Sequence, residues 1–401
     1  MKEDAFRKIQ ALLREIAGNR FQSARLAGLG EITSLDDFTA RVPFTTKADL
    51  VADQAANPPY GSNLTFPLKR YTYFSRTSGT TAQPLTILDT PESWDWMLGN
   101  WERIYREAGI APGDRLYFAF SFGPFLGFWT AFEGAAKLGC LCIPGGGVSS
   151  VVRIGAILQH RAEVLLCTPT YALHLAEVAA REGVSLRDSA VRKIIVAGEP
   201  GGSVLSIRTR ISAAWNDAEV LDHYGMTEVG PVAFQRLAEN DMLHIIEESY
   251  FCEIVEPASG ERVPDGEVGE LVLTPLGRTA NPLLRYRTGD LVRRRPGPGF
   301  SLAGGIIGRR DDMLVIRGVT IHPIAVDAVV RGIPEITEYR VSVTRHGSLA
   351  ELAIEIESDN ETAARRLENS LGEAFALRIP VSRVANGSLP RFELKARRWQ
   401  R

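Results

Sequence analysis

Five short segments of the chain carry small hydroxyl, glycine and acidic residues of the kinds that bind phosphate, sugar or a metal ion. They are "TSGTT" (77–81), "GEP" (198–200), "HYGMTE" (223–228), "YRTGD" (286–290) and "GRRDDMLVIRG" (308–318). Glycine lets the backbone approach an anion, hydroxyl groups donate hydrogen bonds to it, and a carboxylate supplies the hard oxygen that magnesium prefers. The first segment lies between two strand patterns, "RYTYFSR" and "PLTIL". Taken alone it could be a hairpin turn or an anion-binding loop, because Ser, Thr and Gly are also ordinary turn residues.

The five segments, in this order, resemble the motifs of the adenylate-forming enzymes, which include acyl-CoA synthetases and luciferases. Three further segments resemble the phenylacetate–CoA ligase branch: "SFGPFLGFWTAFEGAAKLG" (121–139), "CTPTYALHLAEVA" (167–179) and "SLPRFELKARR" (388–398). The resemblance begins at about residue 40 and covers nearly all of the remaining chain. It implies that ATP activates a carboxylic acid as an acyl adenylate, and that a thiol then displaces AMP.

The resemblance assigns the phosphates of ATP to the first segment and so favours an anion-binding loop over a plain turn. The residues of this β- and γ-phosphate loop are Ser78, Gly79, Thr80 and Thr81. The family loop usually continues Gly-Lys-Pro, whereas this chain has Ala82, Gln83 and Pro84. The missing lysine removes one expected contact to phosphate, while the backbone and hydroxyl donors remain.

Adenosine is assigned to the next segments. "GEP" follows the apolar run "KIIV", so it is expected at the carboxyl end of a strand, where α/β sheets bind ligands. Tyr224 is expected to stack on adenine, and Arg309 to contact the ribose or a phosphate. Asp290 follows Gly289, which is expected to be a turn glycine, and its short carboxylate is expected to accept both ribose hydroxyls. The other residues that the resemblance places here are Gly198, Glu199, Pro200, Asp222, His223 and Gly225.

Two residues at the end of "HYGMTE" are assigned to the reacting phosphates. By resemblance, Thr227 bonds a phosphate oxygen and Glu228 binds magnesium. The structural alternative is a helix N-cap, since Thr followed by Glu is common at that position.

The C-terminal region contains the residues whose expected roles depend on movement of the small domain. Lys395 matches the lysine that stabilises developing charge during adenylation, although the family's preceding glycine is Leu394 here. Asp311 matches the hinge about which the small domain turns between the two half-reactions. Gly318 matches the glycine beside which the pantetheine thiol enters.

An aromatic segment is the candidate acyl pocket. Such residues are more often core, but the resemblance places this segment beside the acid and favours a flat aromatic substrate. The residues expected there are Phe122, Phe125, Phe128, Trp129 and Tyr171. Some relatives carry a Cys/His zinc cluster before the hinge. Here His244 has no pair of cysteines with it before "GRRDD", so three or four ligands cannot be assembled and no structural zinc is expected.

The elements that position these residues form an α/β fold. Helices are expected up to about residue 60, then strands alternating with helices in a mixed, largely parallel sheet, and then a small antiparallel unit rich in Gly/Pro/Asp turns. The expected domains are a large N-terminal ATP- and acyl-binding domain, 1–309, and a small mobile α/β C-terminal domain, 310–401.

Composition limits the partners and the compartment. The 401 residues carry 46 basic and 48 acidic side chains, a net charge of −2, which favours neither nucleic acid nor a membrane surface. The amphipathic N-terminus is unlike a signal peptide. Four cysteines in apolar runs predict buried thiols in a reducing, cytoplasmic setting. We expect a monomer or homodimer that uses ATP, Mg²⁺ and CoA.

Two alternatives remain open at the level of sequence. The acyl group could pass to a carrier-protein phosphopantetheine or an amine instead of free CoA; "VRRRP" (292–296) is a candidate basic site for the CoA 3′-phosphate. The departures at Gln83 and Leu394 raise a second alternative, a non-catalytic nucleotide-binding module. Intact Glu228, Asp290, Arg309 and Lys395 argue against it.

Overall fold

The computed structural model describes residues 2–77, 84–199, 201–236, 239–316, 319–346, 349–392 and 396–400. The chain forms two compact units. Unit 1 comprises Met1–Asp114, Ser121–Cys142 and His223–Ala303, and unit 2 comprises Arg115–Phe120, Ile143–Asp222 and Gly304–Arg401. The predicted domain boundary between residues 309 and 310 lies inside unit 2, so it stays a prediction.

Unit 1 begins with the helices that the sequence predicts. These are α1 (Lys2–Glu15), α2 (Arg20–Leu26), α3 (Leu35–Arg41) and α4 (Lys47–Ala56). Helix α4 starts with a capping box, in which Thr46 and Asp49 each bond the other's backbone N–H. Ile9 and Leu12 of α1, Ile16 directly after α1, and Phe38 of α3 belong to one buried apolar cluster.

A hairpin and two long helices follow in unit 1. Strands β1 (Tyr73–Arg76) and β2 (Thr86–Asp89) pair antiparallel, as the apolar patterns on both sides of the predicted phosphate loop indicated. Helix α5 (Pro91–Glu107) begins directly after β2, capped by Thr90, and packs against α6 (Leu126–Leu138). Indole Nε1 of Trp101 donates to Thr130 Oγ1 at 3.0 Å across these helices.

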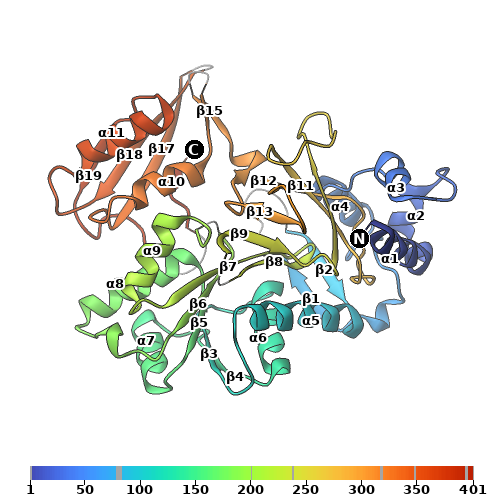
Figure 1. Cartoon of the computed structure of the whole chain (residues 1–401), viewed down its shortest axis with the longest axis horizontal. Helices are drawn as coiled ribbons and strands as arrows, with labels where there is room; N and C mark the ends of the chain where they lie inside the picture. The colour runs from blue at the N-terminus through green and yellow to red at the C-terminus, as the bar shows by residue number, and fades with distance from the viewer. Residues whose placement is uncertain are drawn as a thin grey trace. The chain divides into compact units, whose positions relative to one another are not determined.

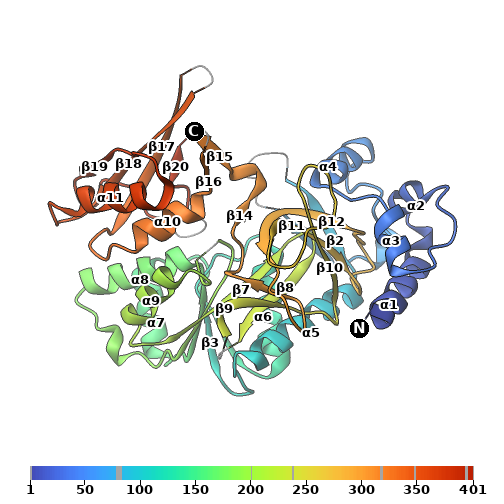
Figure 2. The ribbon, with the colours of Figure 1, turned by 45° about the horizontal axis from the view of Figure 1, so that its top comes forward.

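The antiparallel strands of unit 1 carry two of the motifs. The C-terminal part of β7 (Glu219–Met226) pairs with β8 (Gly230–Arg236), followed in order by β9 (Glu239–Ile245) and β13 (Ser301–Ala303). The predicted antiparallel unit consists of β10 (Tyr250–Val255), β11 (Val268–Pro275) and β12 (Tyr286–Arg293), labelled in Figure 2.

Unit 2 contains the predicted parallel sheet. Strands β3 (Arg115–Phe118), β5 (Val164–Cys167), β6 (Lys193–Val196) and the first half of β7 pair in parallel. Helices α7 (Ser150–Gln159), α8 (Pro169–Arg181) and α9 (Leu205–Ala214) connect them and lie together beside these strands (Figure 1). Strand β4 (Leu141–Pro144) and the short turns η1 (Ile16–Gly18), η2 (Leu68–Arg70) and η3 (Leu186–Asp188) complete the elements before β8.

The C-terminal part of unit 2 is the predicted small α/β region. It starts with β14 (Gly308–Arg309), η4 (Arg310–Asp312), β15 (Leu314–Ile316) and β16 (Val319–Ile321). A sheet in the order β19 (Val381–Val384), β18 (Leu349–Glu357), β17 (Glu338–His346) and β20 (Trp399–Gln400) follows. Helices α10 (Pro323–Arg331) and α11 (Ala363–Phe375) share one apolar core with β17 and β18.

Two predictions from composition can be compared with the described residues. All four cysteines are free; Cys167 is buried, whereas Cys140 and Cys142 are partly exposed, so the prediction of buried thiols is wrong for these two. Cys252 is partly exposed as a residue, but burial of its thiol raises the pKa of that group well above its usual value. In the part of the chain that the structure describes, no helix is both long and apolar enough to cross a membrane.

Candidate active site

The turn between β7 and β8 in unit 1 carries the predicted phosphate and magnesium residues. Thr227 and Glu228 lie in this hairpin turn, so the alternative of a helix N-cap is excluded. The Glu228 side chain is 5% exposed, and its Oε1 lies 3.3 Å from Lys47 Nζ at the start of α4. The sequence reasoning missed Lys47, because nothing in the "TTK" segment indicates a contact with a turn far along the chain.

The predicted ribose residue lies close to the predicted adenine residue. The Tyr224 hydroxyl donates to Asp290 Oδ2 at 2.6 Å, and the Asp290 N–H donates to Thr288 Oγ1 at 3.1 Å. The pairing register of β11 with β12 shifts here, and Gly289 has φ 75°. Asp290 therefore follows a bulge glycine within a strand, and the prediction of a turn glycine was wrong.

His223 and Gly225 flank Tyr224 on β7. His223 is buried against Trp101, and its Nδ1 lies 2.9 Å from the Ala233 carbonyl oxygen. Burial lowers the pKa of His223 to about 4, so the ring is neutral near pH 7 and donates from Nδ1. A Cβ on Gly225 would lie 2.8 Å from the Gly230 carbonyl oxygen, so only glycine fits. Contacts of these two residues with nucleotide stay predictions.

In unit 2, predicted adenosine residues follow neighbouring parallel strands. Gly198, with φ 91°, comes shortly after β6, and Asp222 lies on β7. Glu199 accepts hydrogen bonds from Thr170 N–H at 2.8 Å and Ala396 N–H at 2.9 Å. Asp222 accepts from the Ser203 hydroxyl at 2.6 Å. Glu199 follows the carboxyl end of β6, as the position of "GEP" after a strand predicted, and Asp222 is paired with Val196, the last residue of β6.

The predicted acyl-pocket residues fall into two groups. Phe122 contacts Trp129 with ring centroids 4.8 Å apart, and Phe125 contacts Phe128 at 5.9 Å, all around the start of α6 in unit 1. Trp129 is 42% exposed. Tyr171, by contrast, is a core residue of unit 2 with 0% exposure, and its hydroxyl lies 2.9 Å from Ser150 Oγ. Its place in an acyl pocket stays a prediction.

Several predicted residues lie outside the described residues. They are Ser78, Gly79, Thr80, Thr81, Pro200, Gly318 and Lys395, together with the departures Ala82, Gln83 and Leu394. Arg309 ends β14 and is partly exposed, and Asp311 lies in η4 with an exposed side chain.

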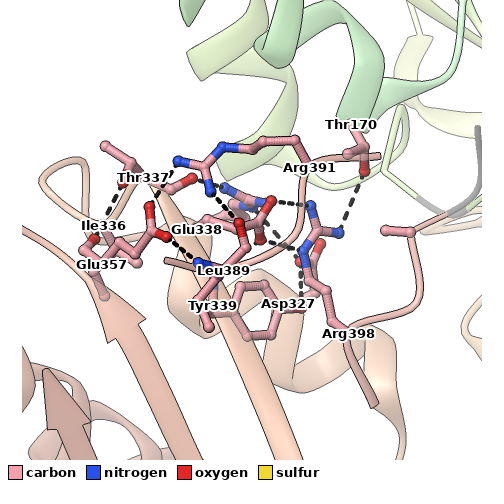
Figure 3. A network of polar contacts seen from close by, with 12 residues as sticks. Thr170, Asp327, Ile336, Thr337, Glu338, Tyr339, Glu357, Leu389, Arg391 and Arg398 are labelled. Atoms are coloured by element: carbon pink, nitrogen blue, oxygen red, sulfur yellow. Dashed lines mark hydrogen bonds and ion pairs between the residues drawn. The ribbon is translucent and has the colours of Figure 1, made fainter. Parts of the chain in front are cut away.

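A charged network surrounds the last residues of unit 2 (Figure 3). Arg398 donates to both oxygens of Glu338 at 2.6 Å and 3.1 Å, and also to Thr170 Oγ1 at 3.3 Å. Arg391 pairs with Glu357 at 2.7 Å and with Glu177 at 3.3 Å. Burial acts to raise the pKa of Glu338, but the hydrogen bonds and charge of Arg398 outweigh it and hold that pKa below its usual value.

The fold and these motifs define a class of protein. Residues 43–275 match the model of the AMP-binding enzymes, and residues 318–400 match the model of the AMP-binding enzyme C-terminal domain. The chain belongs to the AMP-binding enzyme family, in its phenylacetate–CoA ligase-like branch.

Individual proteins show the same relationship. The chain is 34% identical over 334 residues to phenylacetate-coenzyme A ligase of Pseudomonas putida, which covers 82% of this chain and 74% of that protein. It is similar, at 29% identity, to crystal structures of 2-hydroxyisobutyryl-CoA ligase. The TM-score is 0.94 for the postadenylation state with 2-HIB-AMP and 0.75 for the thioesterification state, each covering 100% of this chain and 89% of that one.

These findings confirm the predicted family and α/β fold class. The chain is an AMP-forming acid–CoA ligase: it uses ATP to convert a carboxylic acid into an acyl adenylate, and then transfers the acyl group to CoA. The alternatives of a carrier-protein or amine acceptor, and of a non-catalytic module, are not favoured.

Proposed function

We propose that this ligase activates an aromatic carboxylic acid, and that unit 1 supplies its ribose- and metal-binding residues. The proposed nucleotide-binding role of unit 1 is supported by the 2.6 Å hydrogen bond between Tyr224 and Asp290, because the predicted adenine residue and the predicted ribose residue are in direct contact. Asp290 accepts the ribose hydroxyls, Tyr224 stacks on adenine, and Arg309 contacts the ribose or a phosphate.

Glu228 is the proposed magnesium ligand. Among the described residues no group of three or more His, Cys, Asp or Glu side chains could hold a metal ion. Magnesium commonly uses only one or two carboxylates together with substrate phosphates, so a single buried carboxylate fits this ion. Its nearness to Lys47 Nζ, at 3.3 Å, supports a side chain oriented toward cations. When bound, magnesium would neutralise phosphate charge while the acid attacks the α-phosphorus.

The chain's own residues then serve two half-reactions. In the first, a carboxylate oxygen bonds to the α-phosphorus and the bond to pyrophosphate breaks; Thr227 and the loop 78–81 bind the phosphate oxygens, and Lys395 stabilises the developing charge. In the second, the CoA thiolate attacks the acyl carbon near Gly318, and AMP leaves. We propose that residues 310–401 turn about Asp311 between these steps. The 2-hydroxyisobutyryl-CoA ligase structures, solved in two such states, support this.

The proposed acid class rests on the aromatic cluster around the start of α6. Phe122, Phe125, Phe128 and Trp129 offer ring faces to a flat acid, and relatives named as phenylacetate-coenzyme A ligases act on an aromatic acid. The similarity to 2-hydroxyisobutyryl-CoA ligase supports a second candidate, a small branched acid. We further propose a cytoplasmic monomer or homodimer that binds neither membranes nor nucleic acid.

Pyrophosphate release with a panel of acids tests the proposal. Phenylacetate, benzoate and 2-hydroxyisobutyrate would each be assayed with ATP and magnesium, with and without CoA. The proposal expects the highest kcat/KM for an aromatic acid and a thioester product only when CoA is present. A preference for 2-hydroxyisobutyrate would replace the aromatic assignment with the second candidate.

A further inference from the structure

One fully buried arginine of unit 1 has no part in the roles described so far. Arg278 lies shortly after β11, and its side chain and that of Asp89, the last residue of β2, are both 0% exposed. Arg278 Nε donates to Asp89 Oδ1 at 2.8 Å, and Nη2 donates to Asp89 Oδ2 at 2.6 Å. Two parallel, charge-assisted bonds fix the orientation of both groups.

The other edge of the same guanidinium holds the turn that carries Glu228. Arg278 Nη1 donates to the backbone oxygens of Thr227 at 2.8 Å and of Glu228 at 2.9 Å. One planar group therefore connects the end of β2 to the β7–β8 turn. Buried carbonyl groups without a donor are costly, so this turn depends on Arg278 for its backbone conformation.

Close packing fixes the backbone next to this arginine. A Cβ on Gly277 would lie 2.4 Å from Trp96 of α5, so only glycine allows this approach. The Ala280 N–H donates to Ser93 Oγ at 3.1 Å in the first turn of α5. Arg278 is thus presented to Asp89 by a segment packed against the helix that follows Asp89 in the chain.

We infer that Arg278 is a positioning residue for the nucleotide site, acting through the backbone of Thr227 and Glu228. This inference rests on the proposed role of Glu228 as magnesium ligand. By fixing the turn against Asp89, the arginine holds the Glu228 carboxylate ready for magnesium and the phosphates before ATP binds. Lysine cannot replace Arg278. The planar guanidinium bonds both carboxylate oxygens of Asp89 and two backbone carbonyl oxygens at once, whereas a single ammonium group cannot donate to all four in that geometry.

A purely structural role is the competing explanation, and the chain offers a matched control. Arg285 forms a similar buried pair in unit 1, donating to Glu253 at 3.0 Å and 2.8 Å and to the Val42 carbonyl oxygen at 2.7 Å. The side chains of Arg285 and Glu253 are 8% and 10% exposed. Arg285→Lys should therefore cause a comparable loss of stability without touching the Glu228 turn.

The experiment compares Arg278→Lys, Arg285→Lys and the wild type by thermal unfolding and by pyrophosphate release at varied magnesium, ATP and acid. We expect both variants to lose stability. Only Arg278→Lys should need about tenfold more magnesium for half-maximal rate, the effect of losing one good charge-assisted interaction, while its KM for the acid stays within about twofold of wild type. If Arg278→Lys does not fold, Asp89→Asn, which removes the charge partner at nearly constant shape, should show the same shift.

A double variant identifies the path of the effect. If Arg278 acts through Glu228, then Arg278→Lys combined with Glu228→Gln should have the magnesium dependence of Glu228→Gln alone. Wild-type magnesium dependence of Arg278→Lys, beside an impaired Glu228→Gln, would overturn the inference and leave the proposed function intact. Wild-type behaviour of Glu228→Gln would instead overturn the magnesium assignment itself.

Discussion

The Tyr224 hydroxyl donates a hydrogen bond of 2.6 Å to Asp290 Oδ2, which joins β7 to β12 within unit 1. Asp290 is 5% exposed, and its backbone N–H is held by Thr288 Oγ1. A carboxylate oriented before the ligand arrives loses less conformational freedom on binding, so the geometry favours nucleotide affinity. Two residues assigned to different parts of the nucleotide thus depend on each other.

Removing the phenol should weaken nucleotide binding without changing the fold. Tyr224→Phe keeps the ring for stacking but loses the hydrogen bond, and we expect affinity for ATP and AMP to fall by about tenfold, the usual effect of one bond to a charged group. If Asp290 accepts both ribose hydroxyls as proposed, Asp290→Ala should lose about a hundredfold in affinity for ATP and AMP, because two charge-assisted bonds disappear. Titration calorimetry measures both.

The control is Tyr105→Phe, which removes a buried hydroxyl that donates to the Ala131 carbonyl oxygen at 2.6 Å. This variant should lose stability but bind nucleotide as the wild type does. Unchanged AMP and ATP affinity in Asp290→Ala would show that Asp290 is not a ribose contact.

Magnesium dependence should report on Glu228. In Glu228→Gln a neutral amide replaces the carboxylate, a poorer ligand for a hard cation, so pyrophosphate release at limiting magnesium should fall by about a hundredfold or more. Saturating magnesium should restore part of the rate. Glu253→Gln is the control: it changes another acid of unit 1, with a side chain that is 10% exposed, and should keep the wild-type magnesium dependence. Equal dependence in the two variants would contradict the assignment.

The fold and the motif positions could be predicted because local patterns determine them. "RYTYFSR" and "PLTIL" indicated the β1–β2 hairpin, and "KIIV" indicated the strand before Gly198. Two interpretations of local sequence were wrong because the segments pair with strands elsewhere in the chain. "MTE" has the composition of a helix N-cap, but β8 pairs back onto β7, and Gly289 resembles a turn glycine although β11 holds it within a bulge.

Contacts between distant segments could not be predicted. Arg278 and Asp89 are 189 positions apart, and neither "GRT" nor "LDT" resembles part of a site. Lys47 and Glu228 lie on a helix and a hairpin turn whose proximity only the folded chain reveals. Such pairs depend on tertiary packing, which a single sequence without related sequences does not display.

The neutral state of His223 predicts a pH-dependent stability. Burial lowers its pKa from 6.5 to about 4, so folding favours the uncharged ring. The resulting stability is fully present above pH 6.5 and is lost as pH falls through 4. Since one pKa unit corresponds to about 1.4 kcal/mol, this loss is about 3 kcal/mol.

Denaturant unfolding of wild type and His223→Gln at pH 7 and pH 4.5 measures this contribution. The carboxylates of the protein titrate equally in wild type and variant. The difference between the two proteins in how much the free energy of unfolding changes from pH 7 to pH 4.5 therefore comes from His223. The variant should be less stable at pH 7, since it loses the ring contact with Trp101, but its stability should decline less on acidification. Parallel declines would show that folding does not lower the pKa of His223.

Lys395 and Asp311 together separate the two half-reactions. If the lysine serves only adenylation, Lys395→Ala should lose acyl-adenylate formation by about a thousandfold or more, in the range of groups that stabilise charge in a transition state. It should still convert a supplied acyl adenylate and CoA into thioester. Arg397→Ala removes an exposed cation two positions away and should leave both steps unchanged.

Asp311→Pro should have the opposite effect. Proline fixes φ near the proposed hinge, so the variant should form acyl adenylate and pyrophosphate in a single turnover and then stall before thiol transfer. Asp311→Ala removes the same side chain, which is 68% exposed and 3.6 Å from Arg310, but leaves the backbone free to rotate, so it should complete both steps. Rapid-quench assays of adenylate and thioester follow the two stages separately. Thiol transfer at the wild-type rate in Asp311→Pro would place the hinge elsewhere. Loss of thiol transfer in both Asp311→Pro and Asp311→Ala would show that the reaction requires the carboxylate rather than backbone rotation.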